Sequence, residues 1–140
     1  MIIGYNVKKI VAEKKEETFK RLDISSSPKI LNVKEREVNL GEKRKVASIE
    51  FKFTTEYKPG IGKVEVEGEI LYYDKKIKDI IKSWNKNKKL PTNVDIEVKN
   101  FLFRKCLTLG INLSQELQLP PPLMFPIVTA KKEEDKKYIG

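Results

Sequence analysis

The segment from Ile49 to Tyr57 alternates between apolar and polar residues, and this pattern constrains the fold more than any other. Its odd-numbered apolar positions are Ile49, Phe51, Phe53 and Tyr57. Its even-numbered polar positions are Glu50, Lys52, Thr54 and Glu56. A period of two places these sets on opposite faces of a β-strand, one buried and one in water. The pattern therefore predicts an antiparallel sheet with a core on one side.

A reversal and a second alternating segment follow directly. Pro59-Gly60 suits a turn, because proline presets φ at the first turn position and glycine accepts a positive φ at the next. Beyond this turn, apolar residues again alternate with acidic ones, at Val64, Val66, Ile70 and Tyr72. We expect the two segments to form a hairpin.

Two further strands are predicted before this hairpin. Residues 4–15 alternate at first and shift phase at Ile10 and Val11, which indicates an opening strand with a bulge. A second strand is expected from Ile30 to Leu40. The segment Ser25-Ser26-Ser27-Pro28 between them is typical of a turn-rich crossover. The sheet is then a meander, or a Greek key if a long crossover intervenes.

Two helices are predicted after the sheet. Between Asp74 and Lys89, apolar residues recur with helical spacing at Ile77, Ile80, Ile81 and Trp84. A longer helix is expected to begin at Thr92 as N-cap, with Asp95 near its positive end and a break or bend at Gly110. Its apolar stripe is Val94, Val98, Phe101, Leu102, Leu109 and Leu113. The predicted fold class is α+β, a four-stranded antiparallel sheet packed on a long C-terminal helix.

The length of the chain suits one domain. We assign the domain to residues 1–130 of the 140, and a charged, disordered tail to 131–140. No apolar run approaches the roughly 18 residues of a membrane-spanning helix, and the first residues lack the pattern of a secretion signal. We expect a cytoplasmic protein without membrane insertion.

The residue types that carry most enzyme chemistry are scarce. Histidine, the usual side chain for proton transfer and transition-metal binding, is absent, and Cys106 is the single cysteine. The sequence has no phosphate loop, nucleophile elbow or spaced aspartate cluster. These features argue against an enzyme, a metal site or a cofactor. Cys106 is expected to be a buried core residue.

A net charge of +9 raises the possibility of an acidic partner. The first helix has a basic face made of Lys75, Lys76, Lys78, Lys82, Lys86, Lys88 and Lys89. Such a face can follow a phosphate backbone, so nucleic-acid binding is the alternative function. However, the face contains no arginine for reading base edges, and Trp84 lies on the apolar stripe. A solvated face with surface ion pairs is the simpler interpretation.

The segment from Gln118 to Pro126 combines apolar side chains with prolines. The prolines prevent regular strand pairing and hold Leu123, Met124 and Phe125 on an irregular segment. Such side chains can form the wall of a groove, because little entropy remains to be lost when a ligand binds. The alternative is a strap that only covers the core.

Three segments resemble the SecB family of protein-export chaperones. Phe103-Arg104-Lys105-Cys106-Leu107-Thr108 resembles the Ala-Arg-Glu-Cys-Ile-Thr stretch of the family's long helix. Gln118-Leu119, leading to Pro122 and Phe125, resembles its proline-bearing loop, and Val66-Glu67-Gly68-Glu69-Ile70 is similar to its Gly-rich fourth strand. The resemblance implies a four-stranded antiparallel sheet followed by a long helix, a proline-bearing loop and a shorter helix.

The resemblance also implies a function. SecB proteins are ATP-independent holding chaperones that bind exposed apolar segments of unfolded proteins. Carried over to this chain, the peptide-binding groove would consist of Leu119, Pro122, Leu123, Met124 and Phe125, with Phe51 and Phe53 from the sheet. The family forms homotetramers that are dimers of dimers. The corresponding oligomer interface would consist of Val98, Phe101, Leu102 and Leu109.

The chain departs from the family in charge. SecB proteins are typically acidic and pass their substrates to the SecA motor through an acidic sheet surface. This chain is basic, which argues against SecA as a partner, and its lysine-rich segment at 74–89 has no counterpart. We expect unfolded polypeptides as partners, either in protein export or alongside another partner such as the antitoxin of a toxin–antitoxin pair.

Overall fold

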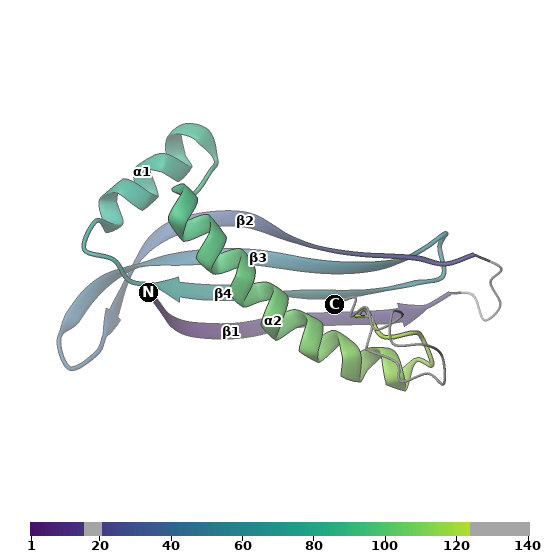
Figure 1. Cartoon of the computed structure of the whole chain (residues 1–140). Coiled ribbons are helices and arrows are strands. Elements are labelled where there is room, and N and C mark those ends of the chain that lie inside the picture. The colour runs from purple at the N-terminus through teal and green to yellow at the C-terminus, as the bar shows by residue number, and fades with distance from the viewer. Residues whose placement is uncertain (16–20, 124–140) are drawn as a thin grey trace, which may run out of the picture.

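The fold is α+β, as the alternation and the helical stripes predict. The computed structural model describes residues 1–15 and 21–123. Four strands precede two helices along the chain (Figure 1). Their bounds are β1 Ile2–Lys14, β2 Asp23–Asn39, β3 Lys43–Lys58, β4 Gly62–Tyr72, α1 Ile77–Asn87 and α2 Thr92–Glu116.

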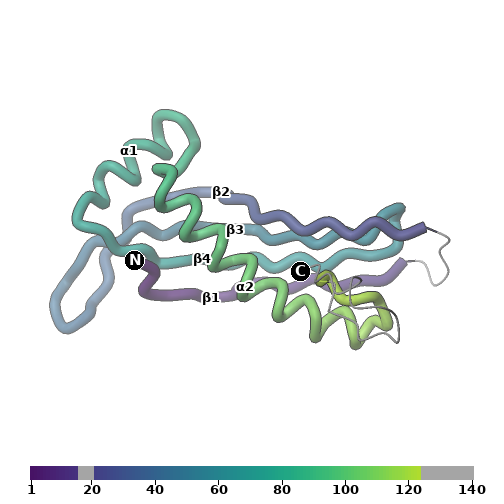
Figure 2. The backbone as a smooth tube through the Cα atoms, viewed as in Figure 1, coloured from purple at the N-terminus to yellow at the C-terminus, as the bar shows by residue number. Residues whose placement is uncertain are grey.

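The strands form one antiparallel sheet in the order β1-β4-β3-β2. Hairpins join β2 to β3 and β3 to β4, whereas the connection from β1 to β2 joins the two edges of the sheet (Figure 2). This arrangement is the Greek key alternative and not the meander. Both helices lie on the same face of the sheet, where α2 contacts all four strands and α1 contacts β2 and β3 (Figure 1).

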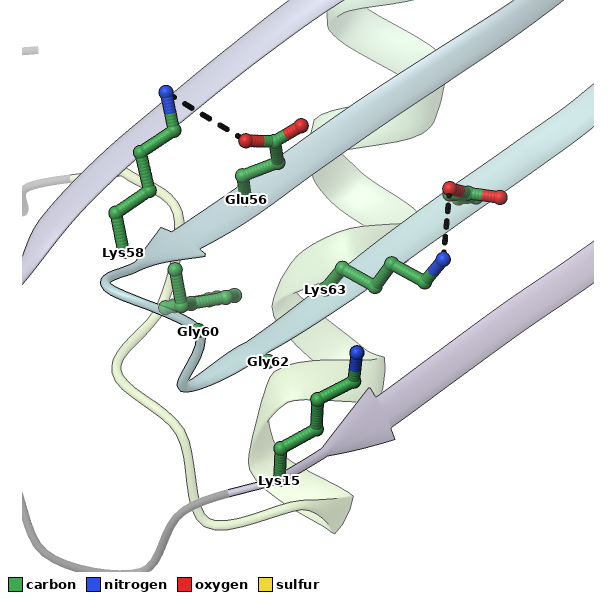
Figure 3. Close-up of a pocket in the computed structure, with 8 residues that line it drawn as sticks. Lys15, Glu56, Lys58, Gly60, Gly62 and Lys63 are labelled. Carbon is green, nitrogen blue, oxygen red and sulfur yellow. Dashed lines mark ion pairs between the residues drawn. The ribbon is translucent and has the colours of Figure 1, made fainter.

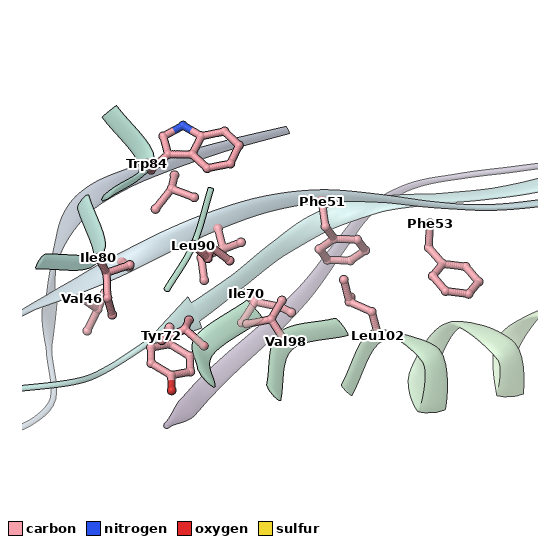
Figure 4. Packing of buried hydrophobic residues seen from close by; sticks show 14 of the residues in the cluster. Val46, Phe51, Phe53, Ile70, Tyr72, Ile80, Trp84, Leu90, Val98 and Leu102 are labelled. Atoms are coloured by element: carbon pink, nitrogen blue, oxygen red, sulfur yellow. The ribbon is translucent and has the colours of Figure 1, made fainter. Parts of the chain in front are cut away.

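The main core lies between the sheet and the helices. In the middle of β3 the odd-numbered residues Ile49, Phe51 and Phe53 face it, and each is at most 1% exposed. On α2, Val98 and Leu102 pack against them, while Trp84 and Leu90 close the core near α1 (Figure 4). The predicted buried face of the sheet is therefore confirmed.

Strand β2 begins seven residues earlier than predicted, at Asp23 instead of Ile30. The prediction that Ser25–Pro28 forms a crossover turn is wrong, because Ser26 pairs with Thr55 and Pro28 pairs with Phe53 in the ladder to β3. β2 is an edge strand and is hydrogen-bonded only to β3. A proline, which has no N–H to donate, is therefore tolerated there. The Ser26 and Thr55 side chains also share a hydrogen bond of 2.8 Å across the strands.

α2 differs from the prediction in its N-cap and in the absence of a break at Gly110. Thr92 is the first helical residue, and Pro91 occupies the N-cap position without a side-chain hydrogen bond. The predicted Thr92 cap is therefore wrong, although Asp95 does lie in the first turn. The helix continues through Gly110 to Glu116, so the chain does not end the helix at that glycine.

Gly68 allows β1 to lie unusually close to β4. A Cβ atom added at Gly68 would lie 2.1 Å from the Asn6 carbonyl oxygen, a backbone atom that cannot rotate away. The ladder between β1 and β4 is irregular beside it, between Val7 and Lys9. On the opposite edge, β2 is irregular between Ile30 and Asn32. Because Gly68 pairs with Val7 on one side and Phe51 on the other, both irregularities occur at the same level of the sheet.

The described residues contain two helices, α1 and α2. Neither is long and apolar enough to cross a membrane.

Candidate peptide-binding surface

The buried face of α2 is a single row of residues at intervals of four. The row consists of Val94, Val98, Leu102, Cys106, Gly110 and Ser114. A helix turns once every 3.6 residues, so a row at intervals of four winds slowly around the helix axis. This matches the oblique path of α2, which crosses from the β2 side near α1 to the β1 side at its other end (Figure 1). One sheet therefore covers only a narrow spiral of this helix.

Half-buried apolar side chains lie on both sides of the buried row. The Phe101 row consists of Phe101, Leu109 and Leu113, and the Phe103 row consists of Phe103, Leu107 and Ile111. Each row repeats at intervals of four or eight and follows the buried row. The centroids of the Phe101 ring and the Tyr5 ring of β1 are 5.2 Å apart. The centroids of the Phe103 ring and the Phe53 ring of β3 are 5.4 Å apart.

The chain after α2 is fixed to the far end of the sheet. Leu119 is 5% exposed and packs with Tyr57 and Ile61 in a small second core. The Tyr57 hydroxyl donates a hydrogen bond of 2.7 Å to the carbonyl oxygen of Pro120. A Cβ added at Gly110 would lie 3.4 Å from the Pro122 ring, so this proline packs against α2 where the helix has no side chain. The start of the proline segment is therefore an ordered part of the fold.

The predicted groove residues fall into three groups. Phe51 and Phe53 are enclosed in the core, and Leu119 anchors the proline segment, so these three side chains do not present a surface in the single chain. Pro122 and Leu123 are half-buried. Met124 and Phe125 lie outside the described residues.

The predicted interface residues differ in how far the chain itself buries them. Val98 and Leu102 are 0% exposed because the chain's own sheet covers them, which leaves no side-chain surface for a second copy. Phe101 and Leu109 belong to the half-buried Phe101 row and remain accessible. Ile96, which the predictions did not include, is 55% exposed on α2.

Sequence reasoning missed Leu107 and Ile111 of the Phe103 row. Their spacing could have revealed them, because the two residues follow Phe103 at intervals of four and so lie on the same side of the helix. A prediction based on one stripe placed the helix's contact residues on a single face. The structure instead shows a buried row with apolar side chains on both flanks.

Cys106 is buried at the centre of α2, as predicted. Cys106 is 2% exposed, and its Sγ lies 3.8 Å from the Tyr5 hydroxyl oxygen. Burial raises the pKa of the Cys106 thiol to about 11. Among the described residues, no group of three or more His, Cys, Asp or Glu side chains could hold a metal ion.

The face of the sheet opposite the helices is a lattice of ion pairs. Lys9 lies 4.0 Å from Glu67, Lys34 lies 3.8 Å from Glu50, and Lys52 lies 3.6 Å from Glu65. Charges of opposite sign on neighbouring strands therefore balance each other over this face.

Glu69 is the most enclosed carboxylate of this outer face. Ser48 donates to it at 2.7 Å and Arg36 at 2.8 Å, and the Lys8 ammonium lies 3.9 Å away. One residue of each strand thus contributes to this cluster. Burial by itself raises the pKa of the Glu69 carboxyl, but the hydrogen bonds and cations outweigh it and hold the pKa below its ordinary value.

A hollow of about 220 Å³ lies at the tip of the β3–β4 hairpin (Figure 3). Its charged groups are already paired, with Lys58 3.6 Å from Glu56 and Lys63 3.2 Å from Glu65. Lys15, which also lines it, lies 3.5 Å from Glu13. The hollow therefore offers little uncompensated charge to a ligand.

The α1 end of the molecule has a different charge balance. All seven lysines between residues 75 and 89 are exposed. None of them forms an ion pair with a carboxylate of the described residues, in contrast to most of the sheet lysines. The only acid within this span is Asp79. Positive charge is therefore concentrated at one end of the fold.

Comparison with known proteins does not identify a relative. No protein-family model matches the chain, and neither the curated proteins nor the solved structures contain a match.

Proposed function

We propose that this protein is an ATP-independent holding chaperone, which binds apolar segments of unfolded polypeptides and slows their aggregation. The observation that supports this proposal most directly is the excess of apolar surface on α2. Side chains of the Phe101 and Phe103 rows extend beyond what the sheet covers. Partly exposed apolar rows on a rigid helix can accept many different sequences, because apolar contact does not depend on direction.

The ordered proline segment supports the same proposal. Tyr57, Leu119 and Gly110 hold its first residues in place, so Pro122 borders α2 without an ordering cost at the moment of binding. The four antiparallel strands and the long helix α2 agree with what the SecB resemblance implies, whereas α1 lies between them without a counterpart in that family. The basic charge of the chain still argues against the SecA motor as a partner.

A homo-oligomer is part of this proposal. Phe101 and Leu109 lie on the side of α2 near β1, where a second copy would cover them. The Phe103 row, on the other side of the helix, would then remain available to a client chain.

Light scattering tests the proposed activity. A chemically denatured protein is diluted into buffer with and without an equimolar amount of this chain, and aggregation is followed over time. We expect slower aggregation without nucleotide. Leu107→Ser combined with Ile111→Ser should weaken the effect, whereas Thr108→Ser combined with Asn112→Ser, at adjacent exposed positions, should not. If the wild-type chain leaves aggregation unchanged, the proposal is wrong.

Nucleic-acid binding is the second candidate, and the unpaired lysines near α1 are the observation that favours it. Such a complex would depend on phosphate contacts and would weaken steeply as salt rises. A gel shift at two salt concentrations tests it. Retained binding at the higher concentration would argue against a phosphate-dominated complex.

A further inference from the structure

A basic pocket lies where the α1–α2 turn and the start of α2 meet the edge strand β2. Its cavity volume is about 470 Å³. This is within the range of about 300 to 1,000 Å³ that is usual for ligand sites. None of the predicted groove or interface residues lines it. The pocket therefore belongs to neither the groove nor the interface described above.

Four apolar residues form part of the wall of the basic pocket. Pro28 and Ile30 come from β2, Trp84 from α1, and Leu90 from the turn between the helices. The Trp84 indole is buried, and its Nε1 hydrogen has no acceptor among the described residues. A buried donor without an acceptor costs free energy.

The charge of the basic pocket is positive and largely uncompensated. Lys88 and Lys89 line it, and neither forms an ion pair with a described carboxylate. The carboxylate that does line it, that of Asp95, lies 3.0 Å from the Lys99 ammonium. Lys29 also lines the pocket without such an ion pair, and the Lys88 ammonium lies 5.7 Å from the centroid of the Trp84 ring. An acidic group that enters would thus meet three lysines without a carboxylate partner and an acid that is already neutralised.

The turn that carries these two lysines is held in one conformation. Lys88 has a φ of 55°, in the left-handed region that side chains other than glycine rarely adopt. Its backbone N–H donates to the Trp84 carbonyl oxygen at 2.8 Å, and the Ser83 hydroxyl donates to the Lys89 carbonyl oxygen at 2.7 Å. Neighbouring Leu90 is buried. A fixed turn presents Lys88 and Lys89 with little backbone entropy left to lose.

We infer that the basic pocket binds an acidic segment of a polypeptide, in which carboxylates meet Lys88 and Lys89 and an adjacent apolar side chain meets the pocket walls. This inference rests on the proposed holding function and specifies its clients as chains with acidic residues beside apolar ones. A nucleic acid fits the pocket less well. Trp84 is only 6% exposed and cannot stack on a base, and no arginine lines the pocket.

Trp84 is the only tryptophan of the chain and lines the pocket, so its fluorescence reports directly on occupancy. The probes are three short peptides with the same apolar residues, spaced by glutamate, glutamine or lysine. We expect the glutamate peptide to shift the Trp84 emission and to saturate, with an affinity about tenfold above that of the lysine peptide. Equal affinities for all three peptides would overturn the inference.

Charge reversal distinguishes binding in the pocket from a general attraction of acidic peptides to the positively charged protein. Lys88→Glu with Lys89→Glu should weaken the glutamate peptide by about tenfold. The matched control is Lys82→Glu with Lys86→Glu, which changes the net charge equally at exposed positions outside the pocket. We expect an effect of about threefold at most from this control, because exposed charges that do not line the pocket are screened by salt. Equal losses in both variants would overturn the inference.

Two further measurements complete the test. A single-stranded oligonucleotide that shifts the Trp84 emission more strongly than the glutamate peptide would assign the pocket to nucleic acid instead. The aggregation assay is repeated with the Lys88→Glu, Lys89→Glu variant. If it protects acidic and basic clients as well as the wild type does, the pocket inference fails while the holding function stands. Peptide binding without any protection by the wild type would leave the pocket and remove the holding function.

Discussion

The Tyr57 hydroxyl donates a hydrogen bond to the Pro120 carbonyl oxygen, and this contact ties the end of β3 to the chain beyond α2. The two residues are 63 positions apart in the sequence. Leu119, beside Pro120, fills the small second core against Tyr57 and Ile61. The start of the proline segment is thereby fixed by the sheet and not by its own sequence.

Replacing Tyr57 by phenylalanine removes this hydrogen bond and leaves the ring in place. We expect a loss of about 1 kcal/mol in the free energy of unfolding, because that is the usual net value of such a bond. Urea denaturation measures it. Tyr73→Phe is the matched control, since the exposed Tyr73 hydroxyl accepts its hydrogen bond from Arg44 at the surface. Equal losses in the two variants would contradict the proposed anchoring role.

Glu69 should stabilise the fold in a pH-dependent way. Glu69→Gln keeps the size of the side chain and removes the charge that Arg36 and Ser48 contact. At neutral pH we expect a loss of about 2 kcal/mol, the value typical of hydrogen bonds to a charged group.

The sign follows from the lowered pKa of Glu69 in the folded protein. Its contribution is present above the ordinary pKa of 4.5 and is lost as the pH falls through the lower, folded value. The stability difference between wild type and Glu69→Gln should therefore shrink on acidification below that ordinary value. Urea denaturation at a series of pH values checks this. A difference that stays constant would show that the charge of Glu69 is not involved.

Two glycines should respond in opposite ways to alanine. At Gly68 the new Cβ would overlap the Asn6 carbonyl oxygen, so β1 must move away from β4. We expect a loss of about 3 kcal/mol or more. At Gly110 the new Cβ makes an ordinary contact with Pro122, and alanine favours a helix by about 1 kcal/mol. Thermal unfolding of both variants is the measurement. A stable Gly68→Ala variant would contradict the close approach of β1.

Cys106 should be unreactive in the folded protein. Burial raises its thiol pKa to about 11, so only about a thousandth of it is thiolate at pH 8. We expect reaction with a thiol reagent such as Ellman's reagent to proceed no faster than unfolding, and to become rapid in urea. Rapid labelling without denaturant would mean that α2 separates readily from the sheet.

The proposed oligomer can be tested at the Phe101 row. Leu109→Glu places a charge among half-buried apolar side chains, which is costly if a second copy covers them. We expect this variant to have the mass of one chain in solution, whereas wild type and Asn112→Glu, at an exposed position of the same helix, should be larger. Light scattering coupled to size exclusion gives these masses. A monomeric wild type would remove the proposed interface.

The sequence predicts this fold well wherever one face meets the core and the other meets water. The alternation from Ile49 to Tyr57 does so, and both its strand and its buried face are confirmed. Ser25–Pro28 was misassigned because serine and proline are common in turns, while here an edge strand needs only one paired side. Whether Ser25–Pro28 forms a strand depends on its pairing with β3, and the residues of the segment itself do not show that pairing.

The surface of α2 was predicted less well than its existence. Val98 and Leu102 have the same apolar character as Phe101 and Leu109, and composition does not distinguish them. Only the oblique path of the helix decides that the first two are covered by the sheet. The basic pocket was missed for a similar reason, because Pro28 and Trp84 are brought together by the Greek key connection and not by proximity in the sequence.

The paired irregularities of β1 and β2 affect how the molecule meets copies of itself. Both outer strands are long and leave one side of their backbone without a neighbour in the sheet. The bulges at Val7–Lys9 and Ile30–Asn32 interrupt the regular spacing of amide and carbonyl groups midway along each margin. Extended stacking of one sheet onto the next, the route to fibres, requires that spacing to continue without a break. The two margins of the sheet therefore resist the edge-to-edge joining that leads to fibres.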